Sequence, residues 1–214
     1  MIRRFDLNIE RSVDIEALGS LKPGEAAEKG AGLNRLYCDH RRISWKEAQR
    51  ILEFEESILE RLQSASDFEE AYDRVEEELD DLYERGECLL MGLDLGVASS
   101  VAALSAAQCI PFTSCNGGVF GQAHQEEYPL IAFYAKPMWI PELIAAAEEA
   151  NAGLYNSGEA LVVYAEIQDM LAFSHAMIVR RGSFRKLKSR VPHNLCGDRV
   201  NKDGPIQLEL PYER

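Results

Sequence analysis

Residues 44–62 read SWKEAQRILEFEESILERL, and this stretch sets the architecture expected of the chain. Ser44 and Glu47 form a capping-box pattern, in which the Ser hydroxyl accepts the N–H three residues on and the Glu side chain accepts the Ser N–H. Apolar side chains behind the box recur at spacings of three and four, namely Trp45, Ala48, Ile51, Leu52, Ile58, Leu59 and Leu62. The spacing predicts an amphipathic helix of about five turns over 44–63.

A second helix follows almost at once. Residues 66–69, SDFE, repeat the capping-box pattern. Apolar side chains again recur at helical spacing, at Phe68, Ala71, Tyr72, Val75, Leu79 and Leu82. This pattern predicts a helix over 67–85 that ends near Gly86. Because only residues 63–66 separate the two helices, we expect an antiparallel helical hairpin within an N-terminal helical region, residues 1–87.

From Cys88 onward the side chains become smaller, more apolar and less often charged. Residues 88–181 are predicted to form an α/β core domain of order αββαβα: helix 95–107 capped by Asp94, strand 109–114, strand 129–135, helix 141–153, strand 160–165 and helix 167–181. The strand–helix–strand part should be a right-handed parallel unit. Residues 182–214 are a basic extension in which 206–210 alternate like an edge strand. The predicted fold class is α+β, or small α/β, with the hairpin packed on a mixed sheet.

Charge is distributed unevenly along the 214 residues, whose formal net charge is −13. Residues 44–87 carry 5 basic and 16 acidic side chains, whereas residues 180–202 carry 8 basic and 1 acidic. Residues 88–179 hold a single basic side chain, Lys136, too few for a nucleic-acid surface. We therefore expect the basic segment 180–190 to dock on the protein's own acidic helices or to be solvated, and we do not expect nucleic acid as a partner.

The expected cellular compartment follows from the absence of a signal-peptide or membrane-spanning pattern and from the spacing of the cysteines. No apolar stretch of signal-peptide length occurs in residues 1–16, and the most apolar segment, 95–107, is too short to cross a bilayer. The five cysteines are odd in number and irregular in spacing, which is typical of reduced thiols. These features predict a cytoplasmic protein with no membrane association.

The densest group of chemically useful side chains lies in residues 113–127. A strand that ends in Ser-Cys-Asn-Gly-Gly must turn sharply and can expose backbone amides, and a thiol beside such amides can have a lowered pKa. The candidate catalytic residues are Cys115, with His124 or Glu127 as proton acceptor, and the candidate ligand-binding residues are Thr113, Ser114, Asn116, Gly117 and Gly118. A purely structural turn is the alternative, since Asn-Gly-Gly is first a turn signal.

Metal and cofactor signatures are weak. Cys38 with His40, His193 with Cys196, and Cys109 with Cys115 are short-range pairs, but none is the Cys-x-x-Cys knuckle of a zinc site, so no metal is predicted. The phosphate-binding, dinucleotide-binding and hydrolase motifs are not found in the sequence. The cofactor, if any, stays unknown at this stage, as does the oligomeric state.

Residues 110–117 read Ile-Pro-Phe-Thr-Ser-Cys-Asn-Gly, a pattern similar to that of two groups of proteins. They resemble small uncharacterised bacterial and phage domains in which a short strand ends in Ser-Cys-x-Gly and an apolar strand follows. They are more distantly similar to the Ser-Cys-Ser-Gly-Arg turn of the tRNA wybutosine-pathway methyltransferase family. That likeness would make Ser114, Cys115 and Gly117 the shared residues, with Gly118 where the family has its Arg.

Three functions remain open from the sequence. The first is a cytosolic, bacterial-type accessory protein that binds a small ligand or a protein partner through the 113–127 loop. The second is a Cys-dependent enzyme that uses Cys115 with His124 or Glu127. The third is an acidic interaction protein that offers the 44–87 hairpin to a basic partner.

Overall fold

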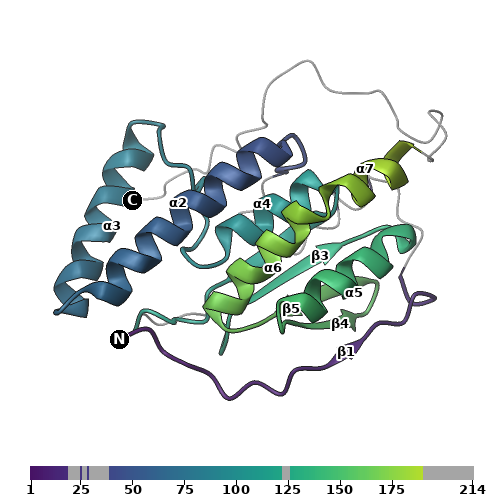
Figure 1. Ribbon diagram of the computed structural model, residues 1–214, viewed down its shortest axis with the longest axis horizontal. Coiled ribbons are helices and arrows are strands. Elements are labelled where there is room, and N and C mark those ends of the chain that lie inside the picture. The colour runs from purple at the N-terminus through teal and green to yellow at the C-terminus, as the bar shows by residue number, and fades with distance from the viewer. Residues whose placement is uncertain (19–24, 26–27, 29–38, 122–125, 190–214) are drawn as a thin grey trace, which may run out of the picture.

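The chain folds as an α+β structure in which helices cover one face of a five-stranded sheet (Figure 1). The computed structural model describes residues 1–18, 25, 28, 39–121 and 126–189. Within these residues, no helix is both long and apolar enough to cross a membrane. The helical hairpin and mixed sheet expected from the sequence are both present.

The sheet has the strand order β1-β4-β5-β3-β2. Its strands are β1 (Arg11–Ser12), β2 (Ile110–Cys115), β3 (Leu130–Tyr134), β4 (Gly153–Ser157) and β5 (Ala160–Tyr164). The short β1 pairs with β4 in parallel, and every other neighbouring pair is antiparallel. Because strand side chains alternate between faces, Ile131, Phe133 and Val163 enter the core beneath the helices.

The helices fall into a hairpin and a covering layer (Figure 1). The hairpin is α2 (Trp45–Ser64) and α3 (Phe68–Glu84), and the others are α4 (Ala98–Ala106), the 3-10 helix η1 (Pro137–Trp139), α5 (Ile140–Glu149), α6 (Ile167–Val179) and α7 (Arg181–Ser189). One buried core joins α2, α4, α5 and α6 to the sheet. In contrast, α3 buries only Val75 of its 17 residues, so it lies on the outside of the fold.

The hairpin caps differ from one another. The capping box at Ser44 is confirmed, since its hydroxyl accepts the Glu47 N–H at 3.2 Å and its own N–H donates to the Glu47 carboxylate at 2.7 Å. The predicted box at Ser66 is wrong. Asp67 caps α3 instead and accepts the Glu70 N–H at 3.1 Å, because the helix begins one residue later than the repeated pattern indicated.

The predicted parallel strand–helix–strand unit is also wrong. Helix α5 ends at Glu149, and the chain then forms β4, a strand that the sequence interpretation assigned to the helix end and the following loop. Gly158, with φ +60°, turns the chain from β4 directly into β5. Since β4 and β5 form a hairpin, β5 returns antiparallel to β3.

The end of the described chain is two helices rather than the single predicted helix 167–181. The helix is interrupted at Arg180. The guanidinium of this residue pairs with Glu142 at 3.6 Å and with Glu149 at 2.9 Å, both on α5. Phe184 of α7 packs against Trp45 of α2 with ring centroids 5.8 Å apart. The basic segment therefore docks on an acidic helix at Arg180, while the predicted edge strand 206–210 lies outside the described residues.

Replacing Ser44 by Ala should lower the free energy of unfolding by about 1 kcal/mol, because the Glu47 N–H loses its acceptor. Ser66→Ala is the matched control and should change stability by less than about 0.5 kcal/mol, since Ser66 is exposed and does not cap α3. Urea unfolding monitored by circular dichroism measures both. Equal losses in the two variants would contradict the assigned caps.

Candidate functional site

The turn at 116–118 is held from two sides. The backbone N–H of Asn116 donates to Asp94 at 3.3 Å, and its side-chain amide donates to the Leu95 carbonyl at 3.2 Å. Its side-chain oxygen accepts the Gly118 N–H at 3.0 Å. Gly117 has φ +68°, and a Cβ there would lie 2.4 Å from the carbonyl carbon of Tyr128. Only glycine therefore fits between the turn and the backbone of Tyr128.

Cys115 is buried at the end of β2, with 6% of its surface exposed. The N–H of Gly117 donates to its sulfur at 3.3 Å. Together with the Gly118 bond to Asn116, this contact satisfies both glycine amides within the turn. The amides predicted to be exposed for an anion are therefore occupied, that of Gly118 by the Asn116 side chain and that of Gly117 by the Cys115 sulfur.

The pairing of β2 with β3 shows on which face of the sheet the other candidate residues lie. Thr113 lies opposite Ala132 and Cys115 opposite Leu130, so both share the sheet face turned away from the helices, whereas Ser114 lies opposite Ile131 on the helix-covered face. Glu127 is exposed, and His124 lies outside the described residues. The structure thus brings Thr113 and Cys115 to one face, does not bring Ser114 with them, and leaves a Cys115–His124 pair a prediction.

Three tyrosines that the sequence did not indicate lie on the same face as Thr113 and Cys115. The Tyr164 ring contacts the rings of Tyr128 and Tyr155, at centroid distances of 5.7 and 5.6 Å. The Tyr164 hydroxyl donates to the Asn8 carbonyl at 2.7 Å and accepts the Glu10 N–H at 3.0 Å, which fixes the N-terminal segment. Burial raises the pKa of Tyr155, and the neighbouring Tyr128 and Glu126 add to that shift.

A second unpredicted feature is the buried carboxylate of Glu55, on α2. It accepts the N–H groups of Gly96 at 2.6 Å, Ala98 at 3.1 Å and Ser99 at 3.0 Å, at the start of α4. Burial raises the pKa of Glu55, and the amide bonds act in the opposite direction. Asp94, the predicted cap of this helix, accepts the Asn116 N–H instead.

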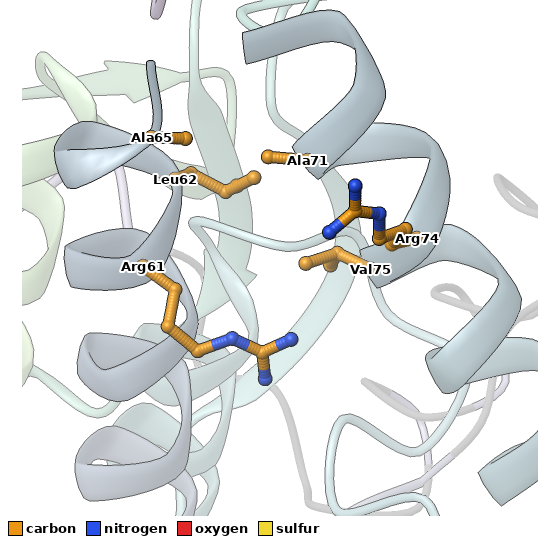
Figure 2. A pocket seen from close by; sticks show the side chains of 6 residues that line it. All are labelled: Arg61, Leu62, Ala65, Ala71, Arg74 and Val75. Carbon is orange, nitrogen blue, oxygen red and sulfur yellow. The ribbon is translucent and has the colours of Figure 1, made fainter. Parts of the chain in front are cut away.

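A hollow of about 220 Å³ lies between the two helices of the hairpin (Figure 2). It is lined by Arg61 and Leu62 of α2, by Ala65 just after that helix, and by Ala71, Arg74 and Val75 of α3. Both guanidinium groups extend into the gap from opposite helices. Arg61 donates to Glu78 at 2.7 Å, and Arg74 pairs with Glu70 one turn earlier on α3.

In the described part of the chain, no group of three or more His, Cys, Asp or Glu side chains could hold a metal ion. Cys109 is fully buried, and burial raises the pKa of its thiol to about 12. No protein-family model, curated protein or solved structure matches the chain. The resemblance of residues 110–117 to the Ser-Cys-x-Gly domains therefore stays a prediction.

Glu55→Ala should lower the free energy of unfolding by about 3 kcal/mol or more, because three buried N–H donors lose their acceptor. Glu60→Ala, on an exposed position of the same helix, should change it by less than about 0.5 kcal/mol. Denaturant unfolding measures the difference. A loss below about 1 kcal/mol at Glu55 would show that the contact does not support the fold.

The thiols provide a test of the enzyme hypothesis. At pH 7.5, iodoacetamide should label half-buried Cys88 at least about tenfold faster than Cys109, since the thiolate is the reactive form and access is required. Burial should also protect Cys115. Peptide mass spectrometry follows each site, with protein in guanidinium as the control for full access. Labelling that is fastest at Cys115 would instead favour a catalytic thiol.

Proposed function

We propose that this protein is an interaction protein that binds a basic protein segment through the outer surface of α3. The observation that carries the proposal is the composition and exposure of this helix. Residues 68–84 carry nine acidic side chains and one basic side chain, and Val75 is the single buried residue. Phe68, Ala71, Tyr72 and Leu79 pack partly buried against the core, so the opposite, acidic face of the helix is the one exposed to a partner.

Four of the acidic side chains form a row along α3. Glu69, Asp73, Glu77 and Asp81 are all exposed and follow one another at intervals of four. Like charges at this spacing destabilise a helix by a few tenths of a kcal/mol for each pair. Among the described residues, these four carboxylates make no ion pair. A partner with lysines or arginines would relieve that repulsion, which the fold itself does not relieve.

The other two functions have less support from the geometry. A ligand in the 113–127 loop would have to compete for amides that Cys115 and Asn116 already occupy. A Cys115 enzyme would need the buried thiol to become accessible. Nucleic acid fits poorly as a partner, because the acidic rows of α3 repel phosphates.

The proposal can be tested with a fluorescein-labelled peptide of six Lys-Ala repeats. Fluorescence anisotropy should show binding at 50 mM NaCl, weakened about tenfold or more at 300 mM, because exposed charges are screened by salt. The triple variant Asp73→Asn, Glu77→Gln, Asp81→Asn should weaken binding about tenfold at low salt.

The control for that variant removes the same number of charges elsewhere, with Glu16, Glu53 and Glu148 each replaced by Gln. All three are exposed and lie outside α3. It should weaken binding less than about threefold, because the local field of the α3 rows is retained. Equal weakening in both triple variants would show an effect of net charge alone and would contradict a binding surface on α3.

A further inference from the structure

The hollow between α2 and α3 gathers the basic side chains of a very acidic region. Residues 51–84 contain 14 acidic side chains and only two basic ones, Arg61 and Arg74. Both line this hollow, although they lie on different helices (Figure 2). Both side chains point toward the hollow, whereas the carboxylates of Glu69, Asp73, Glu77 and Asp81 follow a different row of positions on α3. The hollow is therefore separate from the surface proposed above.

Each arginine is held by a carboxylate of α3. Arg61 uses Nη2 to bond Glu78 at 2.7 Å, and Arg74 uses Nη2 to pair with Glu70. A guanidinium has five N–H donors, so each group retains donors beyond the bond to its carboxylate. The two pairs also offset the repulsion between the guanidinium groups, while the side chains of Arg61 and Arg74 stay 53% and 68% exposed.

The remaining lining is apolar. Leu62 and Val75 are almost completely buried, and two alanines, Ala65 and Ala71, leave the space that larger side chains would fill. A ligand that satisfies both parts of the hollow has an anionic head for the guanidinium groups and a short hydrocarbon tail. At about 220 Å³ the hollow is smaller than a drug-sized pocket, which limits that tail to a few carbons.

The charge of the head can also be specified. A phosphate dianion entering the field of the surrounding carboxylates is repelled about twice as strongly as a monoanion. A carboxylate carries one charge and matches the planar fork of arginine. We propose that the α2–α3 hollow binds a monocarboxylate with a short branched apolar tail, whether a free small acid or the chain terminus of a peptide that ends in leucine.

NMR titration of the ¹⁵N-labelled full chain with 4-methylpentanoate tests the proposal. The Arg61 and Arg74 side-chain signals and the amides of residues 62–75 should shift in a saturable manner. The neutral 4-methylpentan-1-ol should bind at least about tenfold more weakly, because it lacks the charge that the guanidinium groups recognise. Inorganic phosphate should also bind more weakly. No saturable shift, or equal binding of the alcohol or of phosphate, would overturn the proposal.

Variants separate the site from general charge effects. Arg61→Gln and Arg74→Gln should each weaken 4-methylpentanoate binding about tenfold, and Ala71→Leu should abolish it by filling the hollow while retaining both arginines. Arg50→Gln and Arg85→Gln are controls outside the hollow and should leave the affinity within about twofold. Circular dichroism of each variant confirms folding. Equal weakening by the controls would contradict a specific site.

The source of the carboxylate is distinguished by two pentapeptides, Gly-Ser-Gly-Ser-Leu with a free and with an amidated C-terminus. Tighter binding of the free-acid peptide than of 4-methylpentanoate supports a chain terminus as ligand, and the reverse order supports a small acid. Binding of both peptides with equal affinity would contradict carboxylate recognition. The Asp73, Glu77 and Asp81 variant should still bind 4-methylpentanoate, so failure of the α3 proposal and failure of this one are distinguishable.

Discussion

The contact between Glu55 and the first turn of α4 is the constraint on which the helical layer depends. Helix α4 begins without a side-chain cap of its own, so its first amides would be unsatisfied in a dry interior. The Glu55 carboxylate supplies the acceptor from α2, a different element. A buried charge is tolerated here because three N–H donors and the positive end of a helix dipole surround it.

That contact fixes the direction of several neighbours. With α4 anchored on α2, its small side chains allow a close approach, and Ser100 donates to the Met170 carbonyl of α6 at 2.7 Å. Beyond α4 the chain enters β2 and then the Asn116 turn, which binds back to the segment before α4 through Leu95. Helix α2, the start of α4 and the 116–118 turn thus form one connected unit, and these bonds do not include α3.

Local signals in the sequence were sufficient for the hairpin but not for the sheet. Ser44 and Glu47 interact within one turn, so their pattern determines their structure without reference to the rest of the fold. Strand β4 has only a short apolar run and follows a helix end, and its identity depends on pairing with β5 and β1. Propensity alone could not distinguish it from a loop.

In the candidate site too, local features could be predicted from the sequence, whereas contacts between distant segments could not. A sharp turn at residues 116–118 could be predicted, but not that the Asn116 side chain would occupy the turn's own amides. Glu55 has acidic neighbours in the sequence, and glutamates in such a run are ordinarily predicted to be exposed to solvent. Its position, four residues after Ile51 and three before Ile58, places it in the apolar stripe, and that is the one signal that could have revealed it. The pairing of Arg74 with Glu70 follows from their spacing of four on α3, but the pairing of Arg61 with Glu78 depends on how two helices cross, which spacing does not encode.

The N-terminal segment has a consequence for biosynthesis. Asp14 and Asn156 exchange hydrogen bonds although they are 142 residues apart, and Arg11 pairs with Leu154 at the edge of the sheet. Residues 1–14 leave the ribosome long before β4 exists to receive them. During that interval they have no strand to pair with, and the entropy of closing so long a loop makes their docking a late step. The nascent chain must therefore keep its first strand available until nearly all of the described fold has been synthesised.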